Sequence, residues 1–130
     1  LVVTPDDLCM RDAERVIALL DKKQLPRPRL VVNRLVPGLI EKGEMYSADV
    51  VAMTLDCELL GAIPDDPDVY RAQLRHLNFM QLDCPARDAM LRISRRMQGE
   101  DIPVQPYGKK RFWLARLLRP GAKEVIRIDL

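Results

Sequence analysis

Two polar motifs end predicted strands of this sequence, and their residue types suit recognition of a flat heterocyclic ring. Asn33 ends the apolar run at residues 30–33, and Ile-Pro-Asp-Asp at 63–66 ends the next apolar run. Open α/β sheets bind ligands at the carboxyl ends of their strands. An asparagine amide donates and accepts in one plane, which matches the N6 and N7 edge of adenine. The alternative is that Asn33 caps the following loop and that Asp65 and Asp66 begin the next helix.

A loop that could hold nucleotide phosphates is not found in the sequence. Gly38 and Gly43 have the spacing of the Gly-x-x-x-x-Gly-Lys-Ser/Thr motif, but Glu44 and Met45 follow them. A carboxylate in place of the lysine repels phosphate, and no side chain there would hold Mg²⁺. We therefore expect residues 34–46 to be a surface loop and this chain alone not to hydrolyse ATP.

The histidine, the acidic pairs and the cysteines of the sequence indicate neither a catalytic site nor a metal site. His76 is the single histidine, has no nearby nucleophile or carboxylate partner, and is expected at the surface or at a helix end. The acidic pairs at 6–7 and 65–66 are expected to cap helices rather than to form a catalytic dyad. The three cysteines lie far apart, which argues against a disulfide framework or a zinc site and favours a reducing compartment.

Strands and helices are predicted to alternate along the chain. Strands are expected at 1–4, 30–33 and 58–64, and helices at about 8–22, 47–55, 67–77 and 86–98. This order predicts an α/β fold with a partial doubly wound parallel sheet of three strands and crossover helices, followed by a C-terminal amphipathic helix. Ser47 is expected to cap the second helix. A three-stranded sheet leaves an apolar edge unpaired, and the chain begins in a strand-like run, so we expect a piece of a longer protein.

The C-terminal stretch combines basic residues with the single tryptophan. The expected organisation is an α/β unit at 1–99, a linker at 100–108, an amphipathic helix at 109–119 and a tail at 120–130. On a helical wheel one side is apolar and the other basic. The apolar stripe is Trp113, Leu114, Leu117 and Leu118; the basic residues are Lys109, Lys110, Arg111, Arg116 and Arg119.

A short basic helix with a tryptophan on its apolar side fits the interface of an anionic membrane. Five basic residues contribute at most about 5 kcal/mol, and ordering the helix opposes binding. One copy should therefore attach weakly and reversibly, and a dimer with two copies should bind far better. The alternative is that the stripe packs on its own domain. Nucleic acid is the least favoured partner, because no motif that reads bases is present.

Several separate segments together resemble a known family. Residues 32–51 (VNRLVPGLIEKGEMYSADVV) and 59–72 (LLGAIPDDPDVYRA) resemble the septum site-determining MinD family of the ParA and MinD group of deviant P-loop ATPases. The segment RDAER at 11–15 resembles the RDADR helix of the family, and WLARLL at 113–118 resembles its membrane-targeting helix. The resemblance covers about residues 1–119 and only the C-terminal half of the family, whose phosphate loop and switch segments lie further toward the N-terminus.

The resemblance implies an ATP-binding, membrane-associated cell-division regulator that positions the septum. In that family the strand-end asparagine recognises adenine and the proline-acid turn lies beside the base, which implies nucleotide-binding roles for Asn33, Pro64 and Asp65, with Arg34 nearby. Asp12 matches the family position that faces MinC and MinE. ATP or ADP with Mg²⁺ is expected only together with an N-terminal half, as is a homodimer. The implied location is cytoplasmic and peripheral, on the inner face of the cell membrane.

Two other functions stay open from the sequence. The chain could belong to a non-catalytic relative that binds a membrane or a protein partner without turnover. It could also be a fragment of a ParA-like partition ATPase, which would use nucleic acid as its matrix.

Overall fold

A three-stranded parallel sheet lies at the centre of the structure, a computed structural model that describes residues 1–107. The strands β1 (Val2–Val3), β2 (Leu30–Leu35) and β3 (Leu59–Pro64) lie in the order β1-β2-β3. Both pairs are parallel, with Val31 opposite Val2 on one side and Gly61 on the other. The predicted α/β fold with three parallel strands is therefore confirmed, whereas the amphipathic helix and tail predicted for 109–130 lie outside the described residues.

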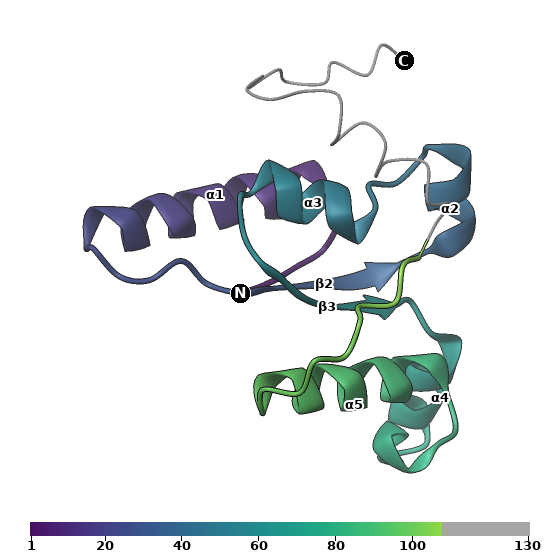
Figure 1. The fold of residues 1–130 in the computed structure, drawn as a ribbon. Coiled ribbons are helices and arrows are strands. Elements are labelled where there is room, and N and C mark those ends of the chain that lie inside the picture. Colours follow the sequence, from purple (N-terminus) through teal and green to yellow (C-terminus); the bar gives the residue numbers. More distant parts are fainter. Residues whose placement is uncertain (108–130) are drawn as a thin grey trace.

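Helices cover both faces of this sheet, as Figure 1 shows. The helices are α1 (Asp7–Lys22), α2 (Pro37–Lys42), α3 (Ala48–Thr54), α4 (Pro67–Leu74), the short 3₁₀ helix η1 (Phe79–Gln81) and α5 (Pro85–Met97). One face carries α1 and α3, and the other carries α5 with α4 beside it (Figure 1). The strands are mostly apolar, as expected of a parallel sheet covered on both faces, and the polar residues of β2 are Asn33 and Arg34 near its end.

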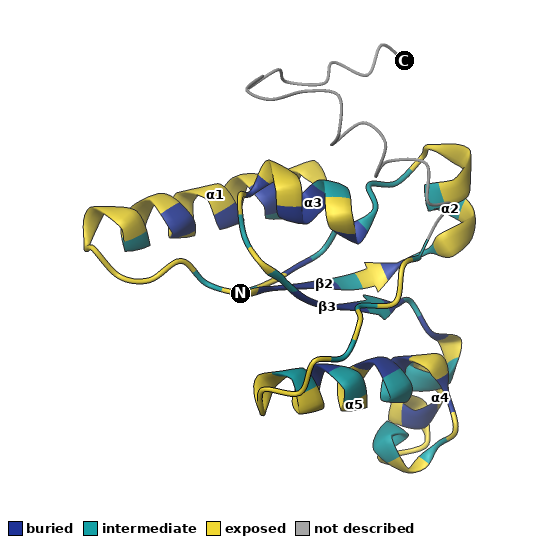
Figure 2. Ribbon diagram, in the orientation of Figure 1, coloured by how far each residue is buried: buried dark blue, intermediate teal, exposed yellow. Residues whose placement is uncertain are grey.

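Each face of the sheet has its own apolar core. The larger core joins the sheet to α1 and α3, whose buried sides turn toward the strands in Figure 2. Its fully buried side chains are Leu30, Val32, Leu35 and Val51. The smaller core lies under α5 and consists of Val31, Leu60 and Ile93. The strand residues of both cores come mainly from β2 and β3.

Helix α5 approaches β3 closely at a glycine. A Cβ atom placed on Gly61 would lie 2.2 Å from Cγ1 of Ile93 and 2.7 Å from its Cδ1. Real side chains do not reach such distances, so this contact requires glycine or a displaced Ile93. The glycine thus sets how near α5 can pack to the sheet.

The segment 34–46 is not the loop that the sequence predicted, because α2 forms within it. Pro37 stands in the first turn, where its fixed φ suits a helix and its missing N–H is no loss. Gly43 ends the helix with φ 78°, a left-handed value, and its N–H donates to the carbonyl groups of Leu39 and Ile40. Pro37 and Gly43 were interpreted as loop residues, but they stand at the beginning and at the end of a short helix.

The other predicted boundaries agree to within a few residues. The caps of α1, α3 and α4 are Asp6, Ser47 and Asp66, as predicted. Helix α4 ends at Leu74 rather than at 77, because His76 adopts a positive φ of 54° beyond the helix end. The expectation of a helix-end histidine is thereby confirmed.

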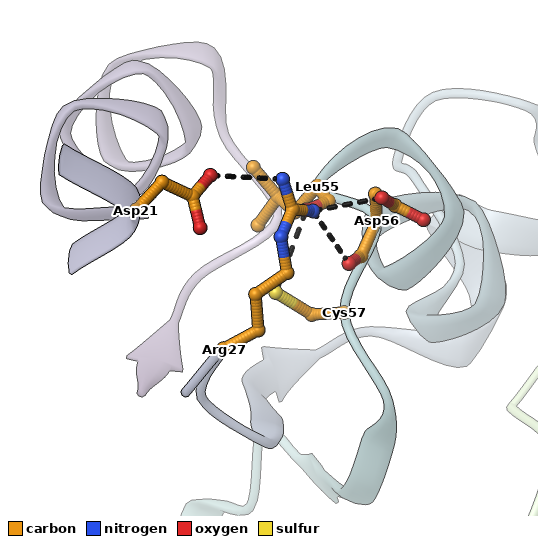
Figure 3. Close-up of polar contacts among 5 residues, drawn as sticks. All are labelled: Asp21, Arg27, Leu55, Asp56 and Cys57. Atoms are coloured by element: carbon orange, nitrogen blue, oxygen red, sulfur yellow. Dashed lines mark hydrogen bonds and ion pairs between the residues drawn. The ribbon is translucent and has the colours of Figure 1, made fainter. Parts of the chain in front are cut away.

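One arginine joins the end of α1 to the loop between α3 and β3 (Figure 3). Nη2 of Arg27 lies 3.0 Å from Oδ2 of Asp21, and Nη1 lies 2.8 Å from Oδ2 of Asp56. Nη1 also donates to the backbone carbonyl of Asp56 at 3.0 Å. The hydrogen bond to Asp21 raises the pKa of Arg27 further. These contacts of Arg27 hold together the two loops that precede β2 and β3. They lie at the end of the sheet opposite the carboxyl edge, where ligands are expected.

Candidate functional site

The two predicted polar motifs meet at the carboxyl edge of the sheet. Asn33 and Arg34 lie near the end of β2, and Asp65 directly follows β3. The backbone N–H of Asp65 donates to the carbonyl of Leu35 at 2.8 Å, which continues the pairing of the strands past the end of β3. Nε of Arg34 lies 3.5 Å from Oδ1 of Asp65. Strand pairing therefore brings together residues that are far apart in the sequence.

The backbone at Arg34 is unusual and shapes this edge. Arg34 has φ 61°, in the left-handed region that side chains other than glycine rarely adopt. Oδ1 of Asn33 accepts the backbone N–H of Arg34 at 2.9 Å, which supports this conformation. This hydrogen bond is the loop cap that the alternative interpretation of Asn33 predicts. It involves the amide oxygen of Asn33 and not its amide nitrogen. The bend turns the Arg34 side chain toward Asp65.

Two cavities adjoin this edge, and Asp65 lines both. The larger has a volume of about 460 Å³ and the smaller about 200 Å³. The larger is lined by Pro37, Pro64, Asp65, Asp66, Pro67, Pro85, Asp88, Arg92, Gln105 and Tyr107. The smaller is lined by Thr4, Pro5, Asp6, Arg34, Val36, Met45 and Asp65. Of the four predicted nucleotide-binding residues, Pro64, Asp65 and Arg34 line a cavity, whereas Asn33 lines neither.

Hydrogen bonds orient the two neighbouring carboxylates in different ways. The hydroxyl group of Tyr70 on α4 donates to Oδ1 of Asp65 at 3.0 Å, which leaves that carboxylate at the cavity wall. Asp66 is buried and caps α4 by accepting the N–H of Asp68 at 3.0 Å. It also accepts the N–H of Ala86, at the start of α5, at 2.9 Å. Asp66 thus joins α4 to α5, whereas Asp65 lies at the wall of both cavities.

Asp66 remains ionised because its hydrogen bonds outweigh its burial. Burial is the largest single influence and raises its pKa, but the bonds from the backbone of Ala86 and Asp68, the side chain of Cys84 and the charge of Arg71 together lower the pKa, so the net shift is downward. A negative charge is therefore fixed in the wall of the larger cavity at neutral pH.

The sequence did not point to several residues of the larger cavity. Arg92 comes from α5, and Gln105 and Tyr107 come from the chain that follows it. The segment 100–108 was interpreted as a linker, so no structural contact was expected of it. Tyr70 could have been found, because it lies on the first turns of the helix that begins after Asp66.

The predicted partner-facing residue, Asp12, lies apart from these cavities on α1. Its side chain is exposed and pairs with Arg15, with Oδ1 3.0 Å from Nη1. Three apolar side chains of the same helix, Leu8, Val16 and Leu19, are also exposed, and the helix contacts the core through Met10, Ala13 and Ile17 instead. The exposed side of α1 thus combines charged and apolar residues.

The remaining predicted site residues are those expected to face a membrane, Lys109 to Leu118, and they lie outside the described part of the chain. Within residues 1–107, no helix is long and apolar enough to cross a bilayer. The same residues contain no group of three acidic, histidine or cysteine side chains arranged to hold a metal ion.

Comparison with known proteins identifies the family. No protein-family model matches the chain. The septum site-determining protein MinD of Helicobacter pylori is 32% identical over 124 residues, which is 90% of this chain and 46% of that protein. MinD of Bacillus subtilis is 35% identical over 108 residues, or 81% of this chain and 40% of that protein. The chain thus spans less than half the length of these curated relatives.

Solved structures agree with the sequence matches. The MinD cell division protein of Aquifex aeolicus superposes with a TM-score of 0.74 at 31% identity, over 80% of this chain and 44% of that chain. The MinC:MinD complex of the same organism gives a TM-score of 0.75 at 32% identity, over 83% of this chain and 45% of the other. The chain is therefore MinD-like and corresponds to the C-terminal part of MinD proteins.

Proposed function

We propose that this chain is the adenine-recognising and membrane-attaching part of a MinD-like regulator that positions the division septum. The relatives carry that function in their names, and the chain spans less than half of their length. The phosphates and Mg²⁺ of the nucleotide would then be held by residues that this chain does not contain. The chain alone contributes recognition of the base rather than hydrolysis.

The observation that carries the proposal is the meeting of two motifs at one sheet edge. Arg34 from β2 and Asp65 from the end of β3 approach to 3.5 Å, and both line cavities at this edge. A carboxylate and an asparagine amide can accept from and donate to the edge of a purine. Ligands of open α/β sheets bind at this carboxyl edge.

The test is nucleotide binding by the full-length protein that contains this chain. Asn33→Ala should weaken ATP binding by roughly 1–3 kcal/mol, which is the contribution of a good bidentate hydrogen-bond contact to adenine. Asn78→Ala is the matched control, because the side-chain oxygen of Asn78 likewise accepts a nearby backbone N–H, that of Met80 at 3.0 Å, but Asn78 caps η1 and does not lie at the end of a strand. Equal ATP affinity in the wild type and Asn33→Ala, measured by calorimetry, would contradict the proposal.

The proposed binding surface for a protein partner lies on α1. A structure of a MinC:MinD complex is among the similar proteins, and Asp12 lies on an exposed side of α1 beside apolar residues. Charged residues at the rim of an apolar patch are typical of protein interfaces. We expect a MinC-like or MinE-like partner to bind here, with the protein attached to an anionic membrane through residues 109–119.

A further inference from the structure

The chain that follows α5 forms a wall of the larger cavity. Residues 101–107, here called the strap, run from the end of α5 across the carboxyl edge of the sheet (Figure 1). Two strap residues, Gln105 and Tyr107, line the cavity opposite Pro64 and Asp65. Without the strap the cavity would be open on this side. The strap is therefore part of the wall of the larger cavity.

The first half of the strap is fixed to the sheet. Arg96 of α5 donates through Nη2 to the carbonyl of Leu59 at 3.1 Å and through Nη1 to the carbonyl of Ile102. One guanidinium group thus ties the strap to the start of β3. Val104 then packs against the larger apolar core.

The second half of the strap is held by Tyr107. Its ring packs against the larger core and faces the cavity, and Arg92 of α5 lies beside its hydroxyl group. Gln105 and Pro106, which directly precede Tyr107, are exposed. Tyr107 is thus the main contact that keeps the end of the strap against the domain.

The lining of the cavity suits a flat ring with polar groups on its edge. Four prolines and the tyrosine ring supply flat apolar surface, and the polar groups include Asp65, Arg92 and Gln105. Aromatic side chains stack on nucleic-acid bases with little regard to sequence, because every base has a π-face. A carboxylate and an amide can accept from an exocyclic amine and donate to a ring nitrogen.

We propose that Tyr107 contacts the base of the nucleotide bound in the larger cavity, so that binding of the nucleotide fixes the strap against the domain. This inference rests on the proposed adenine-binding function and adds a residue that the strand-edge motifs do not contain. A ligand shifts a conformational equilibrium only by contacts that differ between the two states. The contact with Tyr107 is such a contact, because the ring is the part of the strap that faces both the ligand and the core.

The experiment measures ADP affinity and backbone protection in the full-length protein. Tyr107→Ala should weaken ADP binding about 10-fold, within the range of one base–aromatic contact, and Tyr107→Phe should keep most of the affinity because it keeps the ring. Saturating ADP should slow hydrogen–deuterium exchange in the strap of the wild type and not in Tyr107→Ala.

The control is Val104→Ala, which loosens the strap without changing the lining of the cavity. A loss of ADP affinity in Val104→Ala equal to that in Tyr107→Ala would overturn the inference, as would unchanged exchange of the strap on ADP binding. If the wild type binds ADP in a manner that depends on Asn33 but not on Tyr107, the inference fails and the proposed function stands. If the wild type binds no ADP, both fail.

Discussion

Nε of Arg34 and Oδ1 of Asp65 lie 3.5 Å apart, although 31 positions separate the two residues. The contact exists because β2 and β3 pair in parallel, so that their carboxyl ends meet. The side chain of Arg34 is 61% exposed, and such ion pairs stabilise a fold little. The ion pair with Asp65 therefore offsets little of the strain in the left-handed backbone of Arg34.

The first prediction separates the backbone of Arg34 from its charge. Arg34→Gly and Arg34→Ala both remove the guanidinium group, but only glycine adopts the observed φ of 61° without strain. We expect the glycine variant to be more stable than the alanine variant by about 1 kcal/mol, measured as the free energy of unfolding in urea. Both variants should bind ATP more weakly than the wild type. A glycine variant no more stable than the alanine variant would show that the backbone is not strained.

The second prediction concerns the close approach of α5 to β3. Gly61→Ala places a Cβ within 2.2 Å of Ile93 and should lower the free energy of unfolding by about 1–3 kcal/mol. Gly38→Ala is the control, because nothing lies within 4 Å of its added Cβ, and replacing a helical glycine should stabilise by roughly 0.5–1 kcal/mol. The double variant with Ile93→Val should recover part of the loss, since it removes a methyl group from the clash. Additive losses would mean that the clash is relieved elsewhere.

The sheet and its edge could be predicted because they depend on local signals. The apolar runs that became β2 and β3 and the caps Asp66 and Ser47 are each legible within a few residues. The parallel pairing of the strands then follows from the alternation of strands and helices. That Asn33 and Asp65 share one edge of the sheet needed no further information.

The walls of the cavity could not be predicted in the same way. Tyr107 belongs to a strap that Arg96 ties to the carbonyl of Leu59, a contact over 37 positions that no local pattern encodes. Helix α2 was missed for a different reason, because Pro37 and Gly43 occur both in loops and at the ends of short helices. Local sequence patterns were thus insufficient to predict long-range tertiary contacts and short helices.

The third prediction uses the charge of Asp66. Asp66→Ala removes the cap of α4 and leaves the N–H of Ala86 without its partner, so the free energy of unfolding should fall by about 2–3 kcal/mol at neutral pH. The pKa of Asp66 is lower in the folded state than its ordinary value, so its ionised form stabilises the fold above that value and the gain is lost as the pH falls through the folded pKa. Urea titrations should therefore show the difference between wild type and Asp66→Ala shrinking below about pH 4. A difference that does not depend on pH would mean that the charge of Asp66 contributes nothing.

The last prediction concerns the basic segment, which lies beyond the described residues and rests on the sequence alone. The single tryptophan, Trp113, gives a direct signal for membrane attachment. Its fluorescence should shift to shorter wavelength with anionic vesicles and not with neutral ones, because tryptophan prefers the membrane interface and basic residues supply much of the attraction. Added salt should weaken the binding by screening. Leu117→Glu should abolish it by placing a charge in the apolar stripe, whereas Glu100→Ala, before the segment, should not. A tryptophan that already emits at short wavelength without lipid, and does not respond to vesicles, would show that the stripe packs on the domain instead.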